Sequence, residues 1–150
     1  MNDYKAWGED AQAKLAQAEE YLNRWPADAF QKALESAEFL LKAVLERAGK
    51  FVPVSDYKHK LHLLTDKIDR GGCLPPETIA EARKILPELE RINVEGPPSA
   101  PTHVNSIDYT PDVRYPNAGG PSTKRIPKEV AKRRIDLSRQ LYDLLVPYLG

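Results

Sequence analysis

The residues best suited to hold a charged ligand stand together in the second half of the chain. Arg114 and Tyr115 are neighbours, and Pro116 follows them. A fixed guanidinium can bind a phosphate through paired hydrogen bonds, and an adjacent aromatic ring can stack on a base. The same pair could equally be structural, with Tyr115 closing the end of a helical bundle and Arg114 pairing with Asp112 or Glu38. The residue types leave both interpretations open.

Glu38 and Lys42 form a second candidate pair. They stand four residues apart, in the order that favours an ion pair on one side of a helix. In a solvated helix such a pair is worth about 0.3–0.5 kcal/mol. The functional alternative is that the two side chains form the polar rim of a ligand groove.

Four further side chains have spacings that a metal site could use. Asp56, His59, His62 and Asp66 follow one another at intervals of three, three and four residues, on a similar side of one helix. Carboxylates and imidazoles in this pattern could bind a divalent ion. Histidines beside lysines on a helix edge are more often surface or capping groups. We therefore predict no metal site and no cofactor.

The C-terminal part is rich in basic residues. The segment from Gly119 to Arg125, GGPSTKR, resembles an anion-binding loop but lacks the Walker pattern, so we expect a flexible loop. The last helix carries a basic run that Glu129 and Asp136 dilute. Such runs are usually solvated faces, so RNA contact is an alternative that we do not favour. The run comprises Lys124, Arg125, Lys128, Lys132, Arg133, Arg134 and Arg139.

Known catalytic motifs do not occur in the chain. It has no nucleophile elbow, zinc-protease motif, dinucleotide fingerprint or paired cysteine motif. The sequence therefore gives no local basis for catalysis, and we assign no catalytic residue.

A central helix from Ala27 to Gly49 must position most of these groups. Its apolar residues recur at helical spacing and fill one continuous face, with Phe39 roughly opposite. Pro26 suits a first helical turn, and Gly49 suits a C-terminal cap. The apolar face comprises Phe30, Ala33, Leu34, Ala37, Leu40, Leu41, Val44, Leu45 and Ala48.

The remaining helices follow from similar patterns. We predict them at residues 3–22, 57–70, 76–89 and 128–148, with Pro87 kinking or splitting the fourth. The stretch from Asn93 to Pro127 holds seven prolines and hardly any periodicity. We therefore predict one all-α domain over residues 1–150, an up-and-down bundle of about five helices with a long Pro-rich loop before the last.

The composition of the whole chain restricts its cellular compartment and its partners. The 22 basic and 22 acidic residues cancel, so the chain has no global attraction to nucleic acid or membrane. No apolar run is long enough to span a bilayer, and the N-terminus lacks the apolar core of a signal peptide. The single Cys73 fits a reducing compartment. We expect a cytoplasmic protein.

Three stretches, in this order and spacing, resemble the HEPN domain family. The central helix carries A-E-x-x-x-K-A-x-L at Ala37–Leu45. The next helix opens with H-x-L-x-x-L at His59–Leu64, and the loop before the last helix carries R-Y-P at Arg114–Pro116. The resemblance covers about residues 5 to 148.

The resemblance implies a helical bundle, frequent homodimers, and nucleotide or RNA as ligand, often beside a minimal nucleotidyltransferase. One branch of the family consists of toxin–antitoxin RNases, in which an arginine closely precedes a catalytic histidine. Here no arginine lies five to seven residues before His59, His62 or His103. The RNase dyad is absent, which favours the binding branch.

We therefore expect a homodimeric binding module for a nucleotide or another anionic ligand, alongside a nucleotidyltransferase. The alternatives are a degenerate RNase, in which Arg114 and His59 meet in space, and a purely structural interaction protein. The residues expected at the ligand site are Arg114, Tyr115, His59, Lys42, Glu38 and Arg134.

Three expectations concern single side chains. Arg134 falls on the apolar arc of the last helix, so it should point inward and pair with Glu38 or Asp112. Phe39 and Leu63 fall on the backs of their helices, and a two-fold dimer interface should bury at least one of them.

Overall fold

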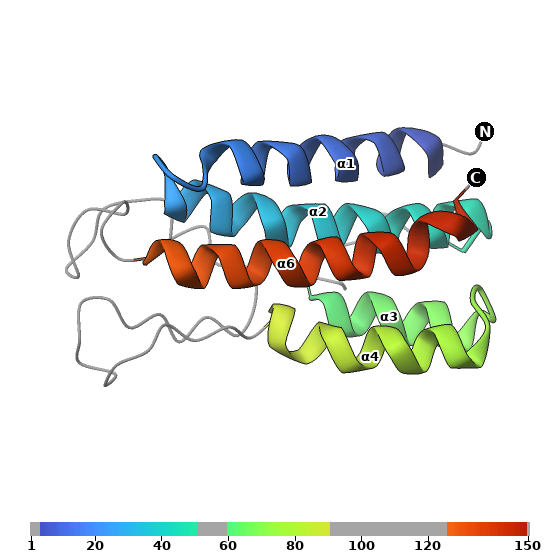
Figure 1. The fold of residues 1–150 in the computed structure, drawn as a ribbon. Helices are drawn as coiled ribbons and strands as arrows, with labels where there is room; N and C mark the ends of the chain where they lie inside the picture. Colours follow the sequence, from blue (N-terminus) through green and yellow to red (C-terminus); the bar gives the residue numbers. More distant parts are fainter. Residues whose placement is uncertain (1–3, 51–59, 91–125, 150) are drawn as a thin grey trace.

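The computed structural model describes residues 4–50, 60–90 and 126–149. Within these ranges the chain forms a bundle of helices and no strand (Figure 1). The prediction of an all-α bundle with about five helices is confirmed. Of the Pro-rich loop from Asn93 to Pro127, only Ile126 and Pro127 are among the described residues. The elements are α1 (Tyr4–Tyr21), α2 (Pro26–Arg47), α3 (Leu61–Arg70), α4 (Pro76–Glu90), α6 (Lys128–Leu145) and the 3₁₀ turn η3 (Val146–Tyr148).

Helix α2 is the centre of the bundle, and α1, α3 and α6 pack around it (Figure 1). Its predicted apolar face is buried from Phe30 to Leu45. Ala48, which was expected on the same face, follows the end of the helix and is exposed. Gly49 follows its end with φ 70°, and the N–H of Lys50 donates to the carbonyl of Leu45 at 2.8 Å. That left-handed glycine ends the helix, as the sequence predicted.

Small residues let α1 approach α2 closely. Ala11 and Ala18 of α1 and Ala29 and Ala33 of α2 are fully buried. The hydroxyl of Ser36 donates to the carbonyl of Ala11 at 2.6 Å, which ties the two backbones together. The two helices run antiparallel, as their short connection requires (Figure 1).

The helix directions follow from contacts at the two ends of the bundle. His62 near the start of α3 meets Glu90 at the end of α4. At the other end, Thr78 of α4 meets Tyr148 of η3 at 2.9 Å. Helices α1 and α4 therefore run against α2, α3 and α6 (Figure 1). Helix direction therefore alternates within the α1–α2 pair and within the α3–α4 pair. Helices α2 and α3, in contrast, run parallel.

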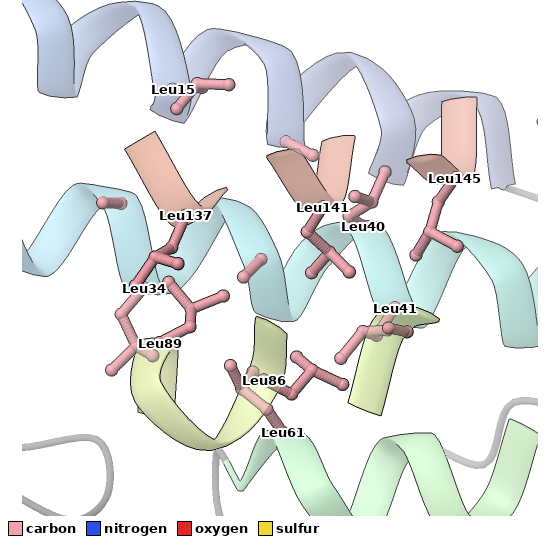
Figure 2. Packing of buried hydrophobic residues seen from close by; sticks show 14 of the residues in the cluster. Leu15, Leu34, Leu40, Leu41, Leu61, Leu86, Leu89, Leu137, Leu141 and Leu145 are labelled. Atoms are coloured by element: carbon pink, nitrogen blue, oxygen red, sulfur yellow. The ribbon is translucent and has the colours of Figure 1, made fainter. Parts of the chain in front are cut away.

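Leucines from each of the described α-helices form the core between these elements (Figure 2). Leu34 and Leu41 of α2 face Leu61 of α3 and Leu89 of α4, and Leu137 of α6 closes the cluster. Burial of such side chains supplies most of the favourable free energy of folding.

Of the two outcomes predicted for Pro87, a split of the helix is ruled out, because α4 continues to Glu90. The proline lies in the last turn, where few backbone hydrogen bonds remain to be lost. Phe39, on the back of α2, contacts another helix of the same chain. Its ring packs edge-on against Trp7 of α1, with ring centres 5.2 Å apart.

Candidate functional site

Glu38 and Lys42 pair as predicted, but in a different environment. Lys42 Nζ donates to Glu38 Oε2 at 2.6 Å, and the two side chains are only 16% and 3% exposed. The ammonium also lies 5.3 Å from the centre of the Trp7 ring. The pair is therefore largely desolvated, unlike the solvated pair that the spacing alone allows.

Gln31 belongs to the same stripe of α2, because it stands seven residues before Glu38. Its side chain is fully buried, and neither amide atom has a hydrogen-bond partner. A buried amide in this state costs free energy. The sequence analysis missed Gln31, although its register with Glu38 could have indicated it.

Arg134 points inward, as predicted, and it is fully buried. Its guanidinium lies 3.7 Å from the centre of the Phe30 ring. Three backbone carbonyls accept its hydrogen bonds: Leu89 at 3.1 Å, Glu90 at 3.4 Å and Phe30 at 3.5 Å. The side chain of Arg134 on α6 is thus hydrogen-bonded to both α2 and α4.

The expected acid partner of Arg134 is corrected. Its hydrogen bonds go to backbone carbonyls rather than to Glu38, and Asp112 lies outside the described residues. Glu38 stands eight residues after Phe30, about 12 Å further along α2. The acid that acts on the guanidinium charge is Glu90. Burial lowers the pKa of Arg134 to about 9, and the Glu90 carboxylate opposes that shift.

Glu90 lies between the buried Arg134 and a half-exposed histidine, His62. Its side chain is 3% exposed, whereas that of His62 is 43% exposed. The two carboxylate oxygens lie 3.0 and 2.8 Å from Nδ1 of His62, and the backbone N–H of His62 donates to Oε1 at 3.1 Å. A buried carboxylate therefore fixes the ring of a half-exposed histidine.

A groove between α3 and α4 opens beside this pair. Its volume is about 390 Å³, within the range of small-molecule sites. Leu86 and Pro87 give it apolar walls, and His62 and Glu90 supply polar groups. We call it the α3–α4 groove. Among the described residues, its lining is His62, Thr65, Asp66, Arg83, Leu86, Pro87 and Glu90.

Arg83 bridges two acids at the edge of the α3–α4 groove. Its guanidinium donates to Asp66 and to Asp69, both at 3.0 Å. Asp66 and His62 thus have separate partners, so they do not form the metal cluster that their spacing allowed. Within the described ranges, no group of three or more potential ligands could hold a metal ion. Asp56 and His59 lie outside those ranges.

Three basic residues of α6 form ion pairs with acids. Arg133 donates to Glu88 of α4 at 2.7 Å, and Lys132 donates to Asp136 at 3.1 Å. Arg139 is paired with Glu19 of α1. These pairs leave the described part of α6 without a continuous positive stripe.

The predicted site residues do not form one cluster in the described structure. Glu38 and Lys42 lie together on α2, and Arg134 lies elsewhere in the core. His59, Arg114 and Tyr115 are outside the described residues. The sequence analysis did not find Glu90 or Arg83. Both depend on the packing of α3 against α4, for which a helical pattern gives no signal.

Comparison of the chain with models of known families, with curated proteins and with solved structures finds no match. The helices of the described residues also lack the combination of length and apolar character that crossing a bilayer requires.

Proposed function

We propose that this chain is a HEPN-like binding module and that the α3–α4 groove is its ligand site. One observation carries the choice of site: apolar walls and polar groups converge there around a buried carboxylate. A concave pocket with a few oriented polar groups is the usual form of a small-molecule site. The resemblance to the HEPN family supplies the ligand class, a nucleotide.

The lining of the groove suits the parts of a nucleotide. Leu86 and Pro87 offer flat apolar contact to a base. The carboxylates of Asp66 and Glu90 can accept hydrogen bonds from its amino groups. Arg83 and a protonated His62 are the cations of the lining that can face a phosphate.

The charge of the groove restricts the ligand to a small one. Asp66 and Glu90 outnumber Arg83 when His62 is neutral. An RNA strand, which needs an extended positive surface, is disfavoured by this balance. A mononucleotide can still bind, because apolar contact and base hydrogen bonds contribute most of its recognition.

Thermal melting with added nucleosides, nucleoside monophosphates and triphosphates tests the site. We expect at least one of them to raise the melting temperature of the parent chain. His62→Gln and Arg83→Gln should lose this increase. Lys84→Gln is the matched control, because Lys84 is an exposed lysine of α4 that lies outside the lining of the groove and donates to its neighbour Glu81 at 2.9 Å.

Two results would count against the proposed site. One is that none of these compounds raises the melting temperature at millimolar concentration. The other is that the two groove variants respond to nucleotide as the control does.

We also propose that the module is a homodimer and works beside a nucleotidyltransferase, as the resemblance implies. Leu63, which is partly buried on α3, is the better candidate for the interface, because Phe39 is already covered by Trp7. Light scattering at micromolar concentration tests the dimer, and a monomer mass would refute it.

A further inference from the structure

The contact between His62 and Glu90 determines which nitrogen of the imidazole ring is basic. The two carboxylate oxygens of Glu90 lie 3.0 and 2.8 Å from Nδ1 of His62. An ionised carboxylate only accepts hydrogen bonds, so Nδ1 carries the proton and Nε2 is the basic nitrogen of the neutral ring. The buried acid thus fixes the tautomer that a general base needs.

Further contacts fix the position of this pair. The backbone N–H of His62 donates to Oε1 of Glu90 at 3.1 Å, so the carboxylate holds the main chain of α3 as well as the ring. On its other side, Arg134 donates to the backbone carbonyl of Glu90 at 3.4 Å, and its charge interacts with that of the carboxylate. The orientation of the imidazole is therefore set before any ligand binds.

The imidazole is accessible from solvent, whereas the carboxylate that orients it is not. The side chain of His62 is 43% exposed, and that of Glu90 is 3% exposed. The ring lines the α3–α4 groove together with Leu86 and Pro87, and the volume of about 390 Å³ can hold a small molecule beside it. An oriented base next to an apolar groove, with a buried acid behind it, is suited to general-base catalysis.

The charges of the groove indicate the class of substrate. Catalysis on a phosphate ester needs cations on the phosphate oxygens. The guanidinium of Arg83, however, already donates to Asp66 and Asp69, both at 3.0 Å. A carboxylic ester is uncharged, and its acyl chain can pack against Leu86 and Pro87. As a reacting group, the groove therefore favours a neutral carboxylic ester over a phosphate ester.

We propose that His62 is a catalytic general base and that the α3–α4 groove hydrolyses small carboxylic esters. Nε2 of His62 takes a proton from a water molecule, and the oxygen of that water attacks the ester carbonyl carbon. The tetrahedral intermediate collapses, the bond to the leaving alcohol breaks, and the imidazolium gives its proton to the alcohol oxygen. One water is consumed, an acid and an alcohol are released, and no oxidant or reductant is required.

Glu90 acts as a positioning residue in this reaction. Its carboxylate stays ionised, keeps the ring in the required tautomer and stabilises the imidazolium that forms. The inference rests on the α3–α4 groove being a small-molecule site, as proposed above, but not on a nucleotide being its ligand.

Hydrolysis of p-nitrophenyl butyrate by the full chain tests the proposal, because the released nitrophenolate is coloured. We expect saturable turnover in the parent chain and a kcat/KM lower by about a hundredfold in His62→Gln. The matched control is His103→Gln, which removes another of the three histidines and should leave the rate unchanged. Circular dichroism verifies that each variant keeps the helical fold.

Glu90→Gln tests the orienting role of the buried acid. Glutamine has nearly the same shape, but its amide N–H can donate to Nδ1 and so permits the wrong tautomer. We expect kcat to fall by about tenfold or more while KM changes little. A folded Glu90→Gln variant with an unchanged kcat would overturn the role assigned to Glu90.

Equal kcat/KM in the parent chain and in His62→Gln would overturn the proposal, as would equal losses in His62→Gln and His103→Gln. Equal rates in water and in heavy water would also overturn it, because a general base transfers a proton in the slow step. None of these results bears on the melting experiments with nucleotides, so the two proposals fail independently.

Discussion

The guanidinium of Arg134 lies over the ring of Phe30 inside the bundle, 3.7 Å from the ring centre. Both side chains are fully buried. An arginine in that position loses its hydration, and the structure replaces the lost water with an aromatic face and three carbonyl groups. Glu90 supplies the compensating charge.

We predict that Arg134→Met destabilises the fold by about 3–5 kcal/mol, because the buried Glu90 carboxylate then loses the charge of the guanidinium and keeps only its other contacts, such as that with His62. Urea denaturation measures the free energy of unfolding. The double variant Glu90→Gln with Arg134→Met should recover a large part of the loss. Additive losses in the two single variants would show that Glu90 and Arg134 are not coupled.

Gln31→Met should stabilise the protein by about 1–3 kcal/mol, because a buried amide without a partner is replaced by an apolar side chain of similar length. Ser36→Ala on the same helix is the contrasting control. Its hydroxyl is also buried but is bonded to Ala11, so its removal should cost about 1 kcal/mol. A loss of stability in Gln31→Met would mean that the amide has a partner in solution.

Glu88 gives a dependence of stability on pH. The guanidinium of Arg133, through its hydrogen bonds, holds the pKa of Glu88 below its usual value of 4.5. A carboxylate whose pKa is lower in the folded state stabilises the fold fully above its unfolded pKa, and this contribution is lost as pH falls through the folded pKa. The melting temperature of the parent should therefore exceed that of Glu88→Gln at pH 7, and the difference should shrink below pH 4.5. A difference that does not change between pH 7 and pH 3 would contradict this assignment.

Gly49→Ala should cost about 1 kcal/mol, since the residue has φ 70° and an alanine there is strained although nothing lies within 4 Å of its added carbon. Gly49→Asn should cost less, because asparagine tolerates this conformation. Thermal melting distinguishes the two variants. Equal stability of Gly49→Ala and the parent would mean that α2 ends in another way in solution.

The sequence predicted the features that depend on local patterns. Periodicity located the helices, and the helical wheel placed Arg134 inside. The hydrogen-bond partners of Arg134 could not be predicted from a helical wheel. Leu89 and Glu90 lie on another helix, and only the packing of α6 against α4 brings them to the guanidinium.

The candidate site was predicted less completely, because several of its contacts join residues of different helices. Glu38 and Lys42 were found because their pairing lies within one helix. The contact between His62 and Glu90 joins residues 28 positions apart, so no local spacing signals it. The contact of Phe39 with Trp7 is also between helices, since Trp7 belongs to α1, and no local spacing signals it.

The carbonyls that Arg134 holds at Leu89 and Glu90 belong to the last turn of α4, where no later residue of the helix can bond them. Helix α4 is therefore capped by a side chain 44 positions further along the chain. This contact closes a long loop, so during folding the end of α4 must stay frayed until α6 has docked. In the native state the end of α4 likewise depends on the docking of α6. Amide hydrogens in the last turn of α4 should therefore exchange with solvent at the rate at which α6 detaches.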